Sequence, residues 1–245
     1  MVRLTRHGWR EMLIGSVVLV STGLVLGFSL SWVFSLVCVP VLIWLFAFFR
    51  DPQRQIPPAG QHVMVSPADG KVSDITEIEH DVLLGGPAVR VGIFLSVFNV
   101  HINRSPCAGR VSAVTYKKGK FINAMNHGAA SDENESNTIV LTEPHTARPV
   151  AVVKQIVGLI ARRIVCTVRV GDAVGRGERI GMIKFGSRTE LTIPKWLRPE
   201  VRVAIGDKVK GASTVIAMLG EAIQVQKPAA DNREYEPLVG RESPA

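Results

Sequence analysis

The phrase that decides the fold is Pro67-Ala68-Asp69-Gly70-Lys71-Val72-Ser73-Asp74-Ile75, which returns 39 residues later as Pro106-Cys107-Ala108-Gly109-Arg110-Val111-Ser112-Ala113-Val114. A second phrase, Gly171-Asp172-Ala173-Val174-Gly175-Arg176-Gly177, returns 35 residues later as Gly206-Asp207-Lys208-Val209-Lys210-Gly211. In the first phrase a glycine suited to positive φ leads into an alternating strand, and in the second Gly-Asp makes a turn that another glycine closes. The two echoes predict a pseudo-duplicated β-barrel or sandwich. The alternative is that such turns recur by chance.

The rest of the polar region is also rich in β-branched runs. Glycine and proline separate these runs, which we expect to form strands at residues 89–100, 139–141, 150–157, 164–170 and 201–205. Long amphipathic helices are hard to find, so the soluble part is predicted to be mainly β. The repeated phrases also resemble the half-motifs of lipoyl and biotinyl carrier domains and of membrane-fusion adaptors. This resemblance keeps open an alternative function, a membrane-anchored, lipoyl-like adaptor without catalysis.

The N-terminal region contains an apolar run at residues 12–49 with no Asp, Glu, Lys, Arg or His. This run excludes a purely soluble protein, and it is too long for the apolar core of a cleaved signal peptide. Two passes of about 18 residues, turning near residues 27–31, fit a hydrocarbon core of about 30 Å better than one tilted span, which is the alternative. Arginines flank both ends, so both ends are expected in the cytoplasm. We therefore divide the chain into an anchor (1–50), a β domain (51–226) and a loose tail (227–245).

Charge and cysteine content narrow the class of partner. The chain has 245 residues with 29 basic and 21 acidic side chains, a net charge of +8. Beside a membrane segment, this excess favours anionic lipid and not nucleic acid as the partner. The three cysteines, Cys38, Cys107 and Cys166, form no C-x-x-C pair and indicate a reducing compartment. The histidines show no ligand spacing, so no metal is predicted.

One peptide bond, Gly186-Ser187, permits unusual chemistry. Because glycine has no side chain, Ser187 Oγ can reach the Gly186 carbonyl and shift the acyl group from nitrogen to oxygen if the backbone is strained there. Elimination from the resulting ester leaves dehydroalanine, which tautomerises and loses ammonia to become an N-terminal pyruvoyl group. A pyruvoyl ketone condenses with amines and withdraws electrons, as pyridoxal phosphate does. An ordinary β-turn is the alternative for this dipeptide.

Six motifs in one order carry a resemblance to a known family. They are Phe48-Phe49-Arg50-Asp51-Pro52, Ser66-Pro67-Ala68-Asp69-Gly70, Val97-Phe98-Asn99-Val100-His101-Ile102-Asn103-Arg104-Ser105-Pro106, Glu133-Asn134-Glu135-Ser136-Asn137, Gly158-Leu159-Ile160-Ala161-Arg162-Arg163-Ile164-Val165 and Phe185-Gly186-Ser187-Arg188. Over residues 10–220 the chain resembles the short-form phosphatidylserine decarboxylases. The resemblance implies a proenzyme that cuts itself into a large chain (1–186) and a small chain (187–245) headed by the pyruvoyl cofactor. It also implies decarboxylation of phosphatidylserine to phosphatidylethanolamine at the cytoplasmic face of the cell membrane. Whether the protein forms a homo-oligomer is left open.

The resemblance also assigns roles to individual residues. Ser187 becomes the cleavage nucleophile and pyruvoyl precursor, and Gly186 becomes the new C-terminus of the large chain. Long-form relatives use an Asp-His-Ser triad with a His-x-x-His motif, in which Asp69 matches the aspartate and His101 the first histidine. Arg104 stands where the second histidine would be, so His101 is left to act as base, to orient the carboxylate or to protonate the product. Asp69 as a turn residue and His101 as a structural residue are the alternatives.

Two adjacent arginines remain from the family motifs. Arg162 and Arg163 are candidates to grip the phosphate or carboxylate of the headgroup, because guanidinium groups bind such anions by paired hydrogen bonds. Surface arginines at a strand end are an equally good explanation.

Overall fold

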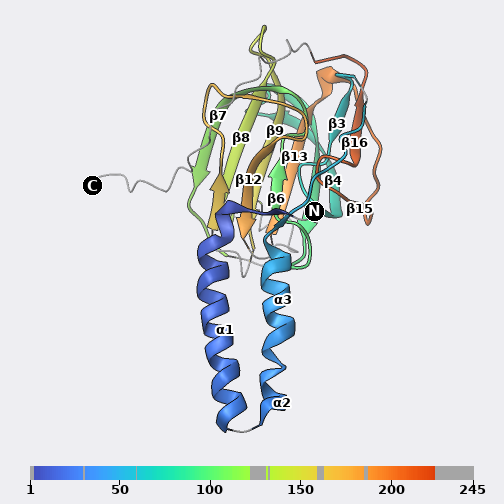
Figure 1. Cartoon of the computed structure of the whole chain (residues 1–245). Helices are drawn as coiled ribbons and strands as arrows, with labels where there is room; N and C mark the ends of the chain where they lie inside the picture. The colour runs from blue at the N-terminus through green and yellow to red at the C-terminus, as the bar shows by residue number, and fades with distance from the viewer. Residues whose placement is uncertain are drawn as a thin grey trace, which may run out of the picture. The chain divides into compact units, whose positions relative to one another are not determined.

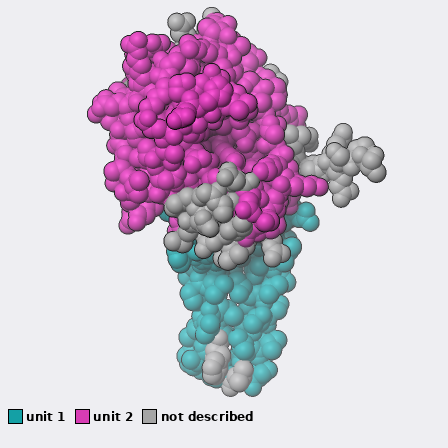
Figure 2. Space-filling view, turned by 180° about the vertical axis from the view of Figure 1, so that it is seen from behind, with its two compact units in different colours: residues 1–53, 97–100 teal, residues 54–96, 101–245 magenta. Residues whose placement is uncertain are grey.

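The computed structural model describes residues 3–29, 31–58, 60–121, 131, 133–158, 163–184 and 187–223. Two units are distinguished by colour in Figure 2. The first unit contains residues 1–53 with Val97–Val100, and the second contains Arg54–Ser96 with the chain from His101 onward. Gly186 and the predicted tail at 227–245 lie outside the described residues.

The apolar segment of the first unit forms two antiparallel helical arms (Figure 1). One arm is α1 (Trp9–Ser29), preceded by the short helix η1 (Arg6–Gly8), and the other is α2 (Trp32–Ser35) followed by α3 (Cys38–Phe48). Gly15 allows close approach, because a Cβ there would lie 2.6 Å from Cδ2 of Leu45. The stretch Arg6–Ser29 has a mean hydropathy of 2.0 and is, among the described residues, the one helix long and apolar enough to cross a membrane.

Short strands join the two ends of this hairpin. Strand β1 (Arg3–Leu4) pairs antiparallel with β2 (Arg50–Asp51), so that Leu4 lies opposite Arg50. The amide of Thr5 donates to the carbonyl oxygen of Phe49 at 2.9 Å. The chain therefore enters and leaves the hairpin at the same end.

The second unit is built almost entirely of antiparallel strands, as the β-rich runs predicted. Its largest sheet has eight strands in the order β11-β7-β8-β9-β13-β5-β4-β15 and curls like half a barrel (Figure 1). These strands are β11 (Ala173–Val174), β7 (Gly109–Lys117), β8 (Ser136–Thr142), β9 (Pro149–Val157), β13 (Ser187–Pro194), β5 (Gly86–Leu95), β4 (Gly70–Asp81) and β15 (Lys208–Val209).

Two smaller sheets complete the second unit. One has the order β10 (Arg163–Cys166), β12 (Arg179–Lys184), β6 (Ile102–Arg104), and the other β14 (Pro199–Val201), β16 (Val215–Leu219), β3 (Val63–Val65), with η2 (Lys195–Leu197) after β13. The main core lies between the large sheet and these two, because it joins Val91, Leu191 and Ile139 to Met64, Ile180 and Ile216. Every one of these six side chains is completely buried.

The two copies of each repeated phrase make matching hydrogen bonds. Ser66 Oγ donates to the carbonyl of Ala68, and Ser105 Oγ to that of Cys107, both at 2.6 Å. Gly171 and Gly206 both have positive φ, 96° and 102°, a backbone conformation that glycine adopts without steric cost. The same register shift also occurs on both copies of the strand, between Val72 and Asp74 and between Val111 and Ala113.

Three predicted strands are shorter than their apolar runs. Strand β5 ends at Leu95, which is the register partner of Ser187 on β13. The run at residues 164–170 is a strand only as far as Cys166, and that at residues 201–205 only at its first residue, Val201. Beyond Val201 the Gly206-Asp207 turn takes over, where Asp207 Oδ2 accepts the amide of Ala204 at 2.8 Å.

Candidate active site

Ser187 is the first residue of β13, in the interior of the large sheet. Its neighbours across the two flanking strands are Leu95 on β5 and Val157 on β9. The side chain is fully buried, and its Oγ atom has no hydrogen-bond partner among the described residues. A buried hydroxyl without a partner is costly, so this atom fits a group held ready for chemistry and not for structure.

A chain of buried side-chain amides lies on the same face of β13. Side chains two residues apart share a face of a strand, so Thr189 projects on the same side as Ser187. Asn103 donates to Thr189 Oγ1, Gln155 donates to Asn103 Oδ1, and Asn137 donates to Gln155 Oε1, each at 2.9 Å. This network joins β6 of one small sheet to three strands of the large sheet.

His101 immediately precedes β6 and is fully buried. Its carbonyl oxygen accepts the amide of Ile183 at 3.2 Å, which places it opposite the strand that leads toward Ser187. It is two residues before Asn103, whose side chain reaches Thr189.

Asp69 lies in the turn before β4, and both of its carboxylate oxygens are occupied. Oδ2 accepts from Arg54 Nη2 at 2.5 Å, and Oδ1 accepts the amide of Gly211 at 2.8 Å. Neither partner is a histidine. The contacts of Asp69 are therefore those of a residue that fixes a turn.

Sequence reasoning missed a buried ionic cluster made by Ser73, Asp74, Arg188 and Glu190, here called the Arg188 cluster. The Arg188 guanidinium is fully buried, 2.6 Å from Asp74 Oδ1 and 2.9 Å from Glu190 Oε1, and it donates to Ser73 Oγ at 2.6 Å. It passes over Gly92 of β5, where a Cβ would lie only 2.2 Å from Arg188 Nη2. Arg188, directly after Ser187, was the one sign of this cluster in the sequence.

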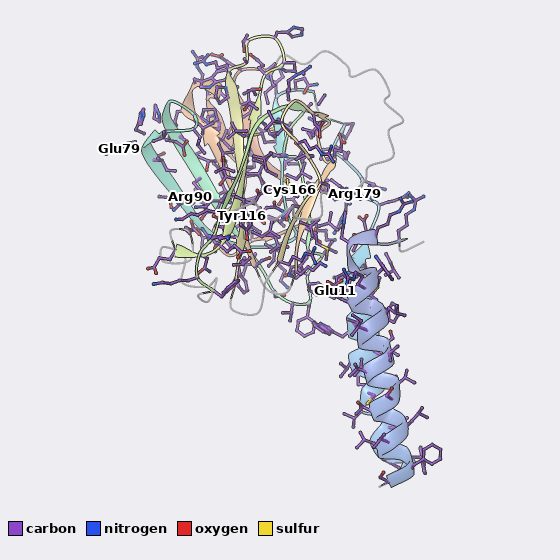
Figure 3. The ribbon with its side chains drawn as sticks, turned by 90° about the vertical axis from the view of Figure 1, so that its left-hand side faces the viewer. Glu11, Glu79, Arg90, Tyr116, Cys166 and Arg179 are labelled. Carbon is purple, nitrogen blue, oxygen red and sulfur yellow. The ribbon has the colours of Figure 1, made fainter. Side chains whose placement is uncertain are left out.

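The electrostatics of the Arg188 cluster favour its charged form. Burial of Asp74 acts to raise the pKa of its carboxyl, but the hydrogen bond from Ser73 and the charges of Arg188 and Arg90 outweigh it and hold this pKa below its ordinary value. Arg90 comes from β5 and is labelled in Figure 3. Because Arg188 follows Ser187 directly, the cluster restrains the backbone at the start of β13.

Comparison with known proteins connects this site to one family. The family profile described as phosphatidylserine decarboxylase matches residues 41–217. The chain is 43% identical over 216 residues to the phosphatidylserine decarboxylase proenzyme of Paraburkholderia phymatum, covering 88% of this chain and 97% of the relative. It is 44% identical over 218 residues to the proenzyme of Rhodopirellula baltica, covering 86% of each chain.

The chain belongs to the phosphatidylserine decarboxylase family. The proenzyme of Burkholderia pseudomallei is a further relative, 42% identical over 220 residues, which is 89% of this chain and 96% of that one. The word proenzyme in these names is consistent with processing of a precursor, and Ser187 is the residue where such processing is predicted here.

Arg104 stands where the His-x-x-His motif would have its second histidine. Arg104 is buried, and its Nη1 donates to the carbonyl of Gly177 at 3.0 Å. Of the two candidate headgroup arginines, Arg162 lies outside the described residues. Arg163 is exposed on β10, and its register partner is the buried Lys184, three positions before Ser187.

The cysteines are poor candidates for the nucleophile. Burial raises the pKa of the Cys107 thiol to about 12, and it also raises the pKa of Cys166, so both thiols are neutral at physiological pH. Within the described ranges, no group of three or more His, Cys, Asp or Glu side chains could hold a metal ion.

Proposed function

We propose that the protein is a self-processing, membrane-associated decarboxylase that converts phosphatidylserine to phosphatidylethanolamine and CO₂. The observation that carries this proposal is the buried Ser187 Oγ, which has no hydrogen-bond partner in the part of the chain that the structure describes and which lies at the start of a central strand, directly after Gly186 in the sequence. Membership of the phosphatidylserine decarboxylase family supports phosphatidylserine as the substrate. It gives no support to the adaptor alternative.

Processing needs groups of this chain and one molecule of water. Ser187 Oγ attacks the Gly186 carbonyl carbon, the peptide C–N bond breaks, and an ester forms with a free Ser187 amine. Loss of the Cα proton then breaks the Cβ–O bond, so Gly186 leaves as a carboxylate. The remaining dehydroalanine tautomerises, and water replaces the nitrogen, which departs as ammonia. The resulting pyruvoyl ketone would supply an electron sink to an amine-bearing substrate.

The buried environment of Ser187 suits this cofactor. The small chain would begin at the first residue of β13, and this strand pairs over its whole length with β5 and from Ser187 to Thr192 with β9. Strands β15 and β16 of the small chain pair with β4 and β3 of the large chain. Sheet pairing therefore holds the new N-terminus in place after the backbone is cut.

His101 is proposed to move the proton that the reaction requires. Its burial, the hydrogen bond that its carbonyl oxygen accepts from the Ile183 amide and its position two residues before Asn103, which bonds Thr189 on β13, support this role. A buried imidazole near the reacting atoms suits transfer of a proton to the carbon that loses CO₂. The triad with Asp69 stays a prediction, and the bonds of Asp69 to Arg54 and Gly211 support a role in fixing the turn before β4.

The headgroup of the substrate carries a phosphate and a carboxylate. We propose that Arg163 and Lys184, together with Arg162, attract these anions. The support is the register of Arg163 with Lys184 on strands that lead to the cleavage site. An exposed cationic side chain such as Arg163 would raise the local concentration of anionic lipid.

The hairpin is proposed to span the cell membrane twice, with both ends in the cytoplasm. Pairing of β1 with β2 supports this topology, because it brings both ends of the hairpin to one side. The exposed Arg3, Arg6 and Arg10 lie at that end, where the positive-inside rule places them in the cytoplasm.

The β domain is proposed to be a pseudo-duplicated sandwich of two lipoyl-like halves. The matching serine bonds and the two glycine turns support the duplication. The two halves are joined where β13 of one pairs with β9 of the other, with Leu191 opposite Val153.

An intact mass spectrum with a denaturing gel tests the proposed function. Wild-type protein should give two chains, the small chain being lighter by one ammonia than a chain cut there by water and carrying a ketone in its place. Ser187→Ala should give one folded, uncut and inactive chain, and Ser187→Cys should cut slowly because a thiolate is a competent nucleophile. Thr192→Val, on the opposite face of the same strand, is the control and should process normally. A single wild-type chain, or an active small chain with a free serine amine, would contradict the proposal.

A further inference from the structure

The loop Val97–Val100 belongs to the hairpin unit, although it lies far from the hairpin in the sequence. Arg50, directly after the second arm, donates to the carbonyl of Phe98 at 2.6 Å and to the carbonyl of Ala47 at 2.5 Å. Phe98 itself is 70% exposed. An exposed phenylalanine is thus held at the polar end of the apolar hairpin.

Aromatic residues mark both ends of this hairpin. Trp9 at the polar end is 61% exposed, and Phe28 and Trp32 at the opposite end are 90% and 69% exposed. Trp9 and Phe28 are 19 residues apart on α1, or about 29 Å at 1.5 Å per residue, which matches a hydrocarbon core of about 30 Å. Exposed aromatic rings at this spacing are typical of the two membrane interfaces. Phe98 therefore belongs to the same interfacial layer as Trp9.

The same end of the hairpin carries positive charge. Arg3, Arg6 and Arg10 are exposed there, and Leu4 pairs with Arg50, the residue that binds the loop. Exposed arginines beside aromatic rings fit a layer of anionic lipid headgroups. The chemistry of the partner is thus a negatively charged bilayer surface.

Chain connectivity ties this loop to the catalytic residues. Leu95, three residues before Phe98, is the register partner of Ser187, and His101 follows Phe98 by three residues. Consecutive Cα atoms are 3.8 Å apart, so the Phe98 Cα lies within about 11 Å of the Cα atoms of both Leu95 and His101. A residue in the headgroup layer is therefore close along the chain both to His101 and to the register partner of Ser187.

We propose that the loop Val97–Val100 is an interfacial anchor, in which Phe98 inserts into the anionic headgroup layer of the bilayer that carries the lipid substrate. This inference rests on the proposed function and adds to it the surface that binds the membrane. The hairpin keeps the protein in the bilayer, whereas the loop sets how readily a lipid enters the site.

Kinetics with two forms of the substrate separate this role from catalysis. Full-length Phe98→Ser should process normally and should turn over short-chain, monomeric phosphatidylserine as wild type does. In vesicles of long-chain phosphatidylserine and phosphatidylcholine, its apparent KM should rise about tenfold, because an apolar ring no longer enters the interface. Phe98→Trp should restore the low KM. Val82→Ser, at an 85% exposed valine in the turn between β4 and β5, is the control and should leave every value unchanged. Unchanged vesicle kinetics for Phe98→Ser, or an equal loss on both substrates, would overturn the proposal.

A fluorescence measurement reports membrane contact without relying on activity. In full-length protein with its three cysteines replaced by alanine, a bimane label at Phe98→Cys should shift to the blue in these vesicles and be quenched by lipids with a nitroxide near the headgroup. The same label at Val82→Cys should stay water-like. A water-like, unquenched label at position 98 overturns the anchor even if the enzyme is active. A quenched label in a protein that neither processes nor decarboxylates supports the anchor and rejects the proposed function.

Discussion

Gly92→Ala should break the Arg188 cluster without removing any charged group. The added Cβ would lie 2.2 Å from Arg188 Nη2, 2.6 Å from Arg188 Cζ and 2.4 Å from Asp74 Oδ1. Carbon atoms in ordinary contact are about 3.5 to 4.0 Å apart, so the guanidinium must move by more than about 1 Å. Such a shift lengthens the contacts of Arg188 with Asp74 and Ser73, which are 2.6 Å each.

The magnitude follows from two costs. Overpacking a buried site costs about 1 to 3 kcal/mol, and weakening a hydrogen bond to a charged group costs about 1.5 to 3 kcal/mol. Because the side chain can relax in part, we expect a loss of about 3 kcal/mol in the free energy of unfolding. For a domain of this size that lowers Tm by roughly 6 to 12 °C.

The assay is thermal unfolding in detergent, made in the Ser187→Ala background so that every sample is one uncut chain. Gly86→Ala is the matched control, since it lies on the same strand and an added Cβ meets nothing within 4 Å. The control should change stability by less than about 0.5 kcal/mol. In the processing-competent chain, Gly92→Ala should also slow self-cleavage, because Arg188 adjoins Ser187. Equal Tm values for Gly92→Ala and Gly86→Ala would refute the reasoning.

Three other predictions concern pH, the proton donor and topology. The pKa of Asp74 is lowered in the folded state, so its stabilising effect is present above its ordinary value of 3.8 and is lost as pH falls through the folded value. Denaturation curves below about pH 4 should show this loss in wild type, and a profile in Arg188→Met that falls equally would count against it. His101→Ala should lower processing or turnover by about 10² to 10⁴-fold, whereas the exposed His80→Ala should have no effect; normal rates would make His101 structural. A reporter active only outside the membrane, fused after residue 60, should stay silent, and a signal there would reject the two-pass topology.

Several features follow from local sequence alone. The β-branched runs between glycines and prolines predict a mainly β domain, and an uninterrupted apolar segment predicts a helix that can cross a membrane. The Gly186-Ser187 bond indicates the chemistry, because a glycine carbonyl beside a serine hydroxyl is a property of two adjacent residues. The echoed Gly-Asp turns are equally local, since positive φ at Gly171 and Gly206 depends on the turn itself.

The environment of Ser187 could not be predicted in the same way. The Arg188 cluster combines side chains from β4 and β13 across Gly92 of β5, and the partners of Asp69 are Arg54 and Gly211. These residues meet because β13 inserts between β5 and β9, a pairing of segments far apart in the chain. The apolar run at 89–100 likewise ends as a strand at Leu95, where β13 begins, and its last residues join the hairpin unit instead.

The physical difference is one of range. Turn conformation, strand propensity and hydropathy depend on neighbours within a few residues, so the amino-acid sequence by itself determined the mainly β architecture, the long apolar N-terminal helix and the placing of a glycine directly before Ser187. Which buried charges are paired, and which hydroxyl has no partner among the described residues, depends on strand order and register. A shift of one residue would exchange the faces on which Ser187 and Arg188 lie. Only the tertiary structure decided that Ser187 faces the buried amides while Arg188 is held among carboxylates on the other side.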